Sequence, residues 1–295
     1  MKDYGLVSVV TATYNMGHYL PIAIRSVLDQ TYQNFEINVI DDGSTDDTKE
    51  VMKQFTDDPR VHYYHQENQG QAKAKNHGIR VSTGKFVAFL DADDRWLPAK
   101  LEKQLPLFEQ NPRVGVVYTD ASYMDENGKI IEIERRKKYF RGQVTEKLFK
   151  DNFVNFPSAI VKKECFNEVG AFDENLPMSI DWDLWLRIST KYEFDYVDEK
   201  LFVYRQWPGQ MSHKFDERFE CILTIMNRFT KEHADLLSNK TIRRAWAHTF
   251  TERSWKARAL EKKRIKAMKF LLKAVRHDPT FMPAWKEIIK VGLFL

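Results

Sequence analysis

Two hydrophobic periods alternate along the first 120 residues of the chain. Short runs of β-branched and apolar residues predict strands, and apolar residues spaced three and four apart predict helices between them. The predicted strands are residues 6–11, 35–40, 61–64, 85–90 and 114–119. The predicted helices are residues 18–30, 46–55, 71–81 and 97–110. Strands that alternate with helices across short connections predict an α/β fold, in which a mostly parallel sheet carries helices on both faces.

The pattern changes after residue 120. Residues 125–128 (DENG) carry the turn signal of a β-hairpin. Two further helices are predicted after it, at residues 144–152 and 181–191, with one short strand between them at residues 159–161. This mixture predicts a second part of the molecule that is built differently from the first.

The last 80 or so residues predict only amphipathic helices, starting at about residue 215. Within residues 265–276 the apolar side chains fall on one stripe, made of Ile265, Met268, Leu272 and Val275. We therefore expect three parts along the chain, residues 1–120, 121–214 and 215–295.

Composition places the chain among folded globular proteins. It has 295 residues, 43% of them hydrophobic, and 46 Lys and Arg against 42 Asp and Glu, a net charge of +4. This balance excludes a disordered chain, and +4 is too small to indicate a nucleic-acid partner. The sequence shows no signal-peptide pattern and no apolar run long enough to span a bilayer, so we expect neither a leader nor a membrane span. The two cysteines, Cys165 and Cys221, have no metal or disulfide spacing, so we expect a cytoplasmic protein with reduced thiols.

Acidic residues follow two of the predicted strands. Asp41 and Asp42 come after the second strand, and residues 91–94 (DADD) after the fourth. Ligands of parallel sheets bind at the carboxyl ends of the strands, and carboxylates so close together repel unless a cation joins them. One cluster alone is typical of a solvated turn, but two at matching strand ends predict a site for Mg²⁺ or Mn²⁺. Asp91 and Asp93 offer the hard oxygen ligands.

The chain lacks the common phosphate-binding loops. Neither G-x-x-x-x-G-K-[ST] nor a G-x-G-x-x-G after the first strand is present. This counts against a P-loop NTPase and a dinucleotide-dependent dehydrogenase. A phosphate would then be held by a metal, by basic side chains or by helix N-termini.

A set of motifs resembles the inverting family 2 glycosyltransferases. Their order and spacing match over roughly residues 6–212. The motifs are residues 7–15 (VSVVTATYN), 26–32 (SVLDQTY), 41–46 (DDGSTD), 68–70 (NQG), 76–79 (NHGI), 89–94 (FLDADD) and 181–187 (DWDLWLR). The resemblance implies the GT-A fold, with a nucleotide-sugar-binding half at residues 1–120 and an acceptor-binding half at residues 121–214.

The resemblance also implies a reaction and its participants. The donor is a nucleotide-diphosphate sugar, typically a UDP-sugar, the cofactor is Mn²⁺ or Mg²⁺, and the acceptor is a hydroxyl of a glycan, a lipid-linked sugar or a protein. Asp42 matches the residue that bonds the nucleobase, and Ala12 and Tyr14 match positions beside the base. Tyr14 is expected either to stack on the base or to belong to the core.

Three further aspartates match the family's catalytic centre. Asp91 and Asp93 match its metal-binding D-x-D pair, with Asp93 as the more direct ligand. Asp181 matches the catalytic base, which takes the proton of the attacking hydroxyl so that one displacement inverts the anomeric carbon. Asp183 and Arg187, on the same predicted helix, are expected to support that helix. Trp182 and Trp185 are expected to form either an acceptor platform or core.

The chain departs from the family pattern in two places. Lys75, with Lys73 nearby, stands where relatives often carry an arginine, and either ammonium could face the diphosphate or only solvent. Trp207 stands where relatives often carry a histidine near the metal, and His213 is the candidate replacement. The Q-x-x-R-W motif of processive polymerising relatives is absent, so a non-processive transferase of polysaccharide or glycan synthesis is expected.

Two other functions remain open at this stage. A nucleotidyltransferase on a similar sheet would need a glycine-rich, basic loop after the first strand. Residues 13–18 hold one glycine and no Lys or Arg, which disfavours this class. A non-catalytic binding or assembly protein with the same fold would not need the aspartates described above.

The near-neutral net charge hides an uneven distribution. Residues 240–276 contain 13 Lys and Arg and two acids, a local charge of +11, and the rest of the chain carries −7. The segment is either a solvated helical face or a surface that docks on anionic lipid at the inner face of the membrane.

Overall fold

The chain folds into two compact units. The computed structural model describes residues 2–133, 138–211 and 214–292. One unit consists of Met1–Val144 and Phe153–Gln210, and the other of Thr145–Asn152 and Met211–Leu295. The sheet lies wholly in the first unit, and the second is helical.

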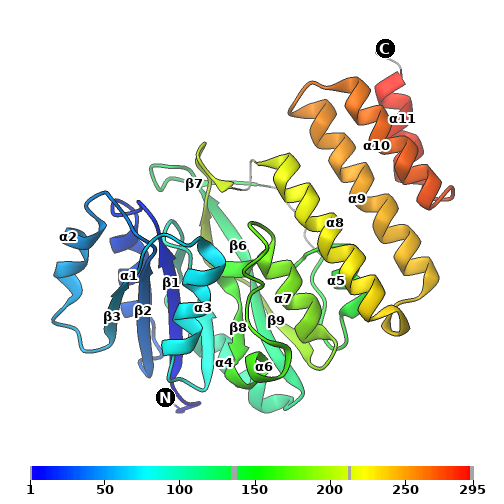
Figure 1. Cartoon of the computed structure of the whole chain (residues 1–295). Coiled ribbons are helices and arrows are strands. Elements are labelled where there is room, and N and C mark those ends of the chain that lie inside the picture. The colour runs from blue at the N-terminus through cyan, green and yellow to red at the C-terminus, as the bar shows by residue number, and fades with distance from the viewer. Residues whose placement is uncertain (1, 134–137, 212–213, 293–295) are drawn as a thin grey trace. The chain divides into compact units, whose positions relative to one another are not determined.

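The first unit is built on one mixed sheet, whose strands follow the order β3-β2-β1-β4-β8-β6-β9-β5 in space, with β7 paired to β6 (Figure 1). Strands β1 to β4 run parallel to one another, and β9 runs parallel to β6. The strand β8 is antiparallel to both β4 and β6, so the two parallel groups run in the same direction. The strands are β1 Val7–Thr13, β2 Phe35–Asp41, β3 Val61–His65, β4 Phe86–Phe89, β5 Arg95–Trp96, β6 Val114–Met124, β7 Ile130–Ile131, β8 Ile160–Lys162 and β9 Glu193–Arg205.

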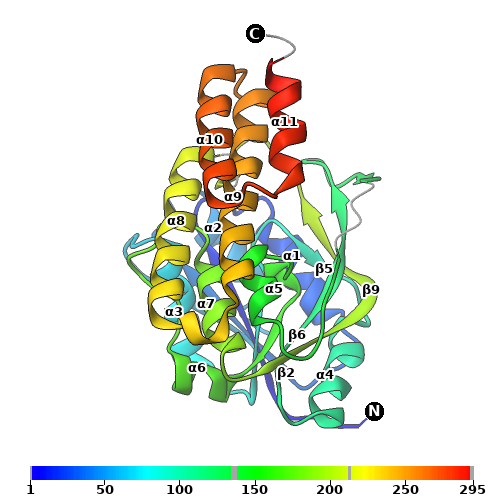
Figure 2. The same cartoon turned by 90° about the vertical axis from the view of Figure 1, so that its right-hand side faces the viewer.

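Helices cover both faces of this sheet, as the sequence predicts. Helix α3 packs on β1 and β2, and α4 packs on β6 and β9. Figures 1 and 2 show these two helices on opposite faces. Each turns an apolar stripe inward; α4, for example, buries Leu101, Leu105 and Phe108 at helical spacing. The helices of this unit are α1 Leu20–Leu28, α2 Thr48–Met52, α3 Gln71–Val81, α4 Lys100–Gln110, α6 Lys163–Val169 and α7 Ile180–Ser189.

The sequence predicts no strand over residues 193–205, where the structure has β9. This long strand is buried at both ends but exposed at Asp198, Glu199 and Lys200. Its pairing with β6 shifts register nearby, so the apolar and polar positions do not alternate. The short β5 and α6 are also unpredicted. The predicted hairpin at residues 125–128 is confirmed as the turn between β6 and β7.

The described residues of the second unit form helices joined by turns. The α-helices are α5 Thr145–Lys150, α8 Phe215–Glu232, α9 Asn239–Ala259, α10 Arg264–His277 and α11 Met282–Gly292. Small side chains let α9, α10 and α11 pack closely, and the most buried of them are Ala247, Ala257, Ala267, Ala274 and Ala284. In α10 the buried stripe is Ala267, Leu271 and Ala274, whereas Ile265 and Leu272 of the stripe singled out in the sequence are exposed.

Helix α5 is an integral part of this second unit. Its Leu148 and Phe149 are fully buried, and the Phe149 ring lies 5.8 Å from that of Phe229 in α8. The carboxylate of Glu146 accepts a hydrogen bond of 2.8 Å from the backbone N–H of Ser238, the N-cap of α9. The chain therefore passes from the first unit to the second at residue 144 and back again at residue 153.

None of the described helices combines the length and the apolar character that crossing a bilayer requires.

Candidate active site

The carboxyl ends of β1, β2 and β4 meet at one edge of the sheet. Thr13 at the end of β1 pairs with Asp41 at the end of β2. The backbone N–H of Asp42 donates to the Thr13 carbonyl over 2.9 Å, and that of Leu90 donates to the Val10 carbonyl over 3.1 Å. The sequence prediction that the acidic residues after these strands share an edge is confirmed.

The loops after β1 and β2 are joined through Asn15. Its side-chain Oδ1 accepts from the backbone N–H groups of Thr45 and Asp46 at 2.7 and 3.3 Å, and its own N–H donates to Ser44 Oγ at 2.9 Å. Asn15 has φ of +54°, a conformation that asparagine tolerates better than most residues. The sequence motif contained Asn15, but nothing in it assigned this joining role. Beside it Tyr14 is 47% exposed, so its placement in the core is wrong, and Ala12 is half-buried.

Asp42 is buried and organises the loop that leads into α3. Its Oδ1 accepts from Gln66 Nε2 at 2.7 Å and from the Gln69 N–H at 3.0 Å, and its Oδ2 accepts from the Gly70 N–H at 2.8 Å. A carboxylate offers about four acceptor positions, so these contacts leave Oδ2 able to accept another donor.

Lys75 of α3 contacts the acidic turn formed by residues 91–94. Its Nζ lies 3.0 Å from Asp91 Oδ1 and 4.2 Å from the centre of the Phe156 ring. Lys75 is buried, so the expectation that it faces only solvent is wrong. Lys73 is half-buried, and it pairs with no carboxylate among the described residues. The structure therefore brings Lys75, and not Lys73, to the acidic turn.

Trp207 holds the second aspartate of the turn. Its indole Nε1–H donates to Asp93 Oδ2 over 2.8 Å. Gly209 makes room for the indole, because a Cβ there would lie 2.0 Å from the Trp207 ring. Burial and the neighbouring Asp91 raise the pKa of Asp93, and the Trp207 hydrogen bond opposes that rise. The residue that departs from the family pattern is thus in direct contact with the predicted metal ligand.

Asp94 and Arg205 complete the turn; Asp94 belongs to the acidic cluster noted in the sequence, but neither residue was assigned a role there. Asp94 is buried; its Oδ1 accepts from the Arg205 N–H at 2.8 Å, and its Oδ2 has no partner among the described atoms. Burial, with Asp93 and Asp91 nearby, raises the pKa of Asp94 well above its usual value. The buried guanidinium of Arg205 donates to the Asp93 carbonyl and lies 4.2 Å from the Tyr19 ring.

The acidic turn suits a divalent cation. Three carboxylates lie in four residues, and burial, together with repulsion from the neighbouring carboxylates, raises the pKa of Asp93 and of Asp94. A divalent cation would relieve that repulsion. Within the described residues no three His, Cys, Asp or Glu side chains are arranged to hold a metal together. Mg²⁺ and Mn²⁺ commonly take only one or two carboxylates and receive other oxygens from a bound phosphate. His213, the other candidate ligand, lies outside the described residues.

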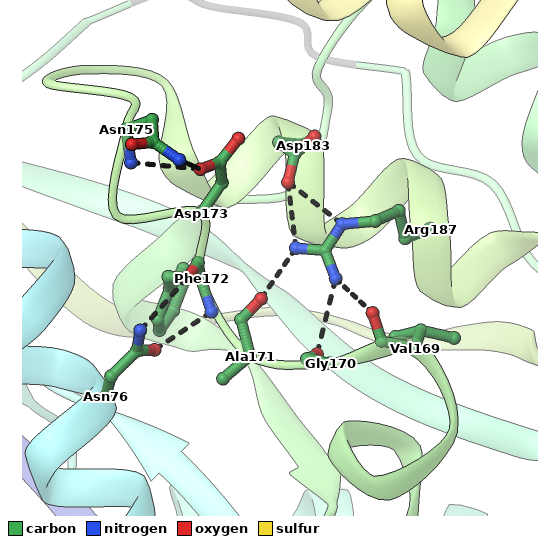
Figure 3. Close-up of polar contacts among 9 residues, drawn as sticks. All are labelled: Asn76, Val169, Gly170, Ala171, Phe172, Asp173, Asn175, Asp183 and Arg187. Atoms are coloured by element: carbon green, nitrogen blue, oxygen red, sulfur yellow. Dashed lines mark hydrogen bonds and ion pairs between the residues drawn. The ribbon is translucent and has the colours of Figure 1, made fainter. Parts of the chain in front are cut away.

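Asp181 lies in the first turn of α7, and the loop before that helix is fastened to α3. Gln71 Nε2 donates to the Pro177 carbonyl over 3.0 Å. The Asn76 side chain makes two hydrogen bonds to the backbone of Phe172, of 2.9 and 3.0 Å (Figure 3). It makes a third, of 2.8 Å, to the side chain of Glu174. Since Lys75 on the same helix contacts Asp91, α3 fastens both the acidic turn and the approach to α7.

Asp183 and Arg187 form an ion pair on α7 and support that helix, as expected. Two nitrogens of Arg187 donate to Asp183 Oδ2 at 2.9 and 2.8 Å, and the same guanidinium reaches the carbonyl groups of residues 169–171 (Figure 3). Trp182 and Trp185 are both buried, so the acceptor-platform alternative is wrong and they belong to the core.

The chain belongs to glycosyl transferase family 2, whose model matches residues 8–170. An uncharacterized glycosyltransferase of Methanocaldococcus jannaschii is 35% identical over 208 residues, which cover 69% of this chain and 71% of that protein. One from Rickettsia bellii is 38% identical over 197 residues, and a chondroitin synthase of Escherichia coli is 28% identical over 201. These matches cover 66% and 68% of this chain but only 28% and 29% of those longer relatives.

Solved structures share the fold, which is the GT-A fold with a helical C-terminal region. Staphylococcus aureus TarS 1–349 in complex with UDP-GlcNAc has a TM-score of 0.71 at 18% identity, over 92% of this chain and 81% of that one. The mannosyltransferase PcManGT from Pyrobaculum calidifontis, in complex with GDP-Man and Mn²⁺, has a TM-score of 0.65 at 19% identity, over 97% and 79%.

Proposed function

We propose that the protein is a metal-dependent, inverting, non-processive glycosyltransferase that uses a UDP-sugar donor and a hydroxyl acceptor in glycan or polysaccharide synthesis. The observation that carries the proposal is the convergence of Asp42 and the acidic turn 91–94 at one edge of the sheet. Residues 1–120 would bind the donor, and residues 121–214 would hold the acceptor and the base.

The donor's nucleoside would bind where the β1 and β2 loops meet. Asp42 Oδ2 retains an acceptor position for the N–H of a base, and the exposed Tyr14 ring offers a surface on which a base can stack. Ala12 can contribute only its backbone. A ring N–H next to a carboxylate favours uracil, and TarS, which shares the fold, was solved with UDP-GlcNAc.

The diphosphate would lie at the acidic turn. A bound Mn²⁺ or Mg²⁺ would neutralise the charge that grows on the leaving UDP. Asp93 would hold the ion through Oδ1, because its Oδ2 accepts from Trp207. Lys75 offsets the charge of Asp91, and Arg205 fixes the backbone of the turn.

Asp181 would act as the base. Its carboxylate takes the proton of the acceptor hydroxyl while that oxygen bonds to the anomeric carbon. The bond between the same carbon and the UDP oxygen breaks on the opposite face, and the electron pair leaves with UDP. The product sugar therefore has the inverted configuration.

Calorimetry of UDP binding tests the proposal. We expect binding with Mn²⁺ present, its loss in EDTA, and at least tenfold weaker binding in Asp93→Ala. Asp57→Ala changes an exposed carboxylate elsewhere in the unit and serves as the control. Equal affinity with and without EDTA would contradict the metal's role, and preference for another nucleoside diphosphate would contradict the donor.

A further inference from the structure

The outward faces of α10 and α11 expose large apolar side chains. Those on α10 are Ile265, 71% exposed, and Leu272, 62% exposed. Those on α11 are Met282 and Ile289, each 60% exposed, and Trp285, 42% exposed. The two helices pack against each other and against α9 through their opposite, alanine-rich sides (Figure 2). Isolated exposed apolar residues are ordinary, but repeated ones along two neighbouring helices indicate an interaction surface.

Basic side chains share these faces. On α10, Lys269 and Arg276 are exposed. Each follows one of the apolar residues, Ile265 or Leu272, by four positions, so it lies on the same side of the helix. On α11, the exposed Lys286 follows Met282 at the same interval. None of these three cations pairs with a carboxylate among the described residues.

Acidic side chains are missing from the same faces. Residues 264–286 contain one acid, Asp278, which is buried and binds Thr280. The next acid, Glu287, is also buried and pairs with Arg258. The positive charge of residues 240–276 therefore falls into two groups. Cations that point inward, such as Arg253 and Lys266, form ion pairs with Asp216 and Glu261. Lys269, Arg276 and Lys286 have no such carboxylate partner among the described residues.

We propose that the outward faces of α10 and α11 bind the surface of an anionic lipid bilayer. Ile265, Leu272 and Ile289 would enter the boundary between headgroups and acyl chains, and the cations beside them would contact lipid phosphates. Trp285 suits the same depth, since its ring is amphipathic. A nucleic acid would bind the cations but would make no favourable contact with exposed aliphatic side chains. An anionic bilayer interacts favourably with both kinds of residue.

Vesicle co-sedimentation of the full chain tests this proposal. We expect binding to phosphatidylcholine vesicles that contain phosphatidylglycerol, little binding to pure phosphatidylcholine, and release as salt is raised. The double variant Ile265→Ser/Leu272→Ser and the double variant Lys269→Ala/Arg276→Ala should each lower the bound fraction at least fivefold. All four positions are exposed, so folding should survive, which a thermal melt checks.

Matched controls change the same residue types in the other unit. Ile130→Ser alters an apolar side chain that is 50% exposed on β7, and Lys49→Ala alters an exposed lysine of α2. Both controls should bind vesicles like the parent. Absence of binding to anionic vesicles at low salt would overturn the proposal. Two other results, each without vesicle binding, would also overturn it. One is a concentration-dependent dimer that Leu272→Ser abolishes, and the other is DNA binding that Lys269→Ala/Arg276→Ala abolishes. UDP calorimetry on the same samples tests the catalytic proposal separately.

Discussion

At the scale of single residues, the acidic turn shows how neighbours define a side chain's role. Asp91, Asp93 and Asp94 have the same chemistry, but one pairs with a lysine, one accepts from an indole and one is buried against a backbone N–H. In Asp93 the Trp207 indole holds one of the two carboxylate oxygens. Its orientation should therefore depend on Trp207.

Trp207→Phe keeps the ring but removes the N–H donor. We expect Mn²⁺-dependent UDP binding to weaken about tenfold or more, since a hydrogen bond to a charged group contributes about 1.5–3 kcal/mol. Calorimetry measures the change. Tyr19→Phe, which alters the neighbouring ring without touching Asp93, should leave the affinity close to that of the parent. An unchanged Trp207→Phe affinity would show that the indole does not orient Asp93.

Asp181→Asn replaces the proposed base with a group of the same shape that cannot take a proton. We expect kcat to fall by a factor of about 10²–10⁴ while UDP affinity stays the same. Steady-state kinetics with the acceptor, together with UDP calorimetry, separate the two effects. Turnover within a few fold of the parent would remove Asp181 from that role.

The sequence supplied most of these candidate residues but not their partners. Asp42, Asp91 and Asp93 stand out because they follow strands whose ends meet at one edge. Arg205 could not be found in this way, and Trp207 stood out only through the family resemblance, because both reach the turn from the end of β9, more than 100 residues further along the chain. Local patterns carry no information about such distant contacts.

At the scale of elements, α3 is the part that joins the two sides of the site. Its Lys75 contacts the acidic turn, and its Asn76 holds the loop before α7. The sequence predicts α3 with the bounds that the structure has, because helical spacing is a local signal. The contacts of α3 lie in the acidic turn and in the loop before α7, and the sequence pattern carries no sign of these contacts.

Asn76→Ala should disturb this connection. It leaves the buried N–H and carbonyl of Phe172 without partners, which costs about 1–3 kcal/mol of stability for each unsatisfied group. We expect a lower Tm and a lower kcat, with UDP affinity largely kept, because the start of α7 would shift.

Gln71→Ala is the matched control on the same helix. It removes a single, more exposed hydrogen bond to Pro177, so its Tm should change little. If both variants melted alike, the Asn76 contacts would not be the ones that fix the loop.

At the scale of the whole molecule, one buried lysine should make stability depend on pH. Lys100 at the start of α4 is fully buried, and its Nζ lies 3.8 Å from the centre of the Trp96 ring with no hydrogen-bond partner among the described atoms. Burial lowers the pKa of Lys100 well below 10.5. Between that lowered pKa and 10.5 the unfolded chain binds one more proton than the folded one, so stability rises with pH.

Lys100→Met should remove this penalty. We expect a higher Tm near neutral pH, by about 2–4 °C for each kcal/mol gained, and a flatter dependence of Tm on pH above neutrality. Thermal melts across pH 6–10 measure both. Lys103→Met, at an exposed position of the same helix, is the control and should change neither the Tm nor its pH dependence. A lower Tm for Lys100→Met would contradict the prediction, because it would mean that the Lys100 ammonium is charged and stabilised in the fold.

Helix α5 has a consequence for how the protein is made. Its buried Leu148 and Phe149 rest on α8 and α9, but α9 begins only at Asn239, roughly 90 residues later. At about 5–20 residues per second, a ribosome needs about 5–20 s to supply that cover. During this interval the nascent chain displays an apolar segment whose partners have not been synthesised. A chaperone that binds apolar segments of nascent chains would therefore find one exposed at α5 during this interval.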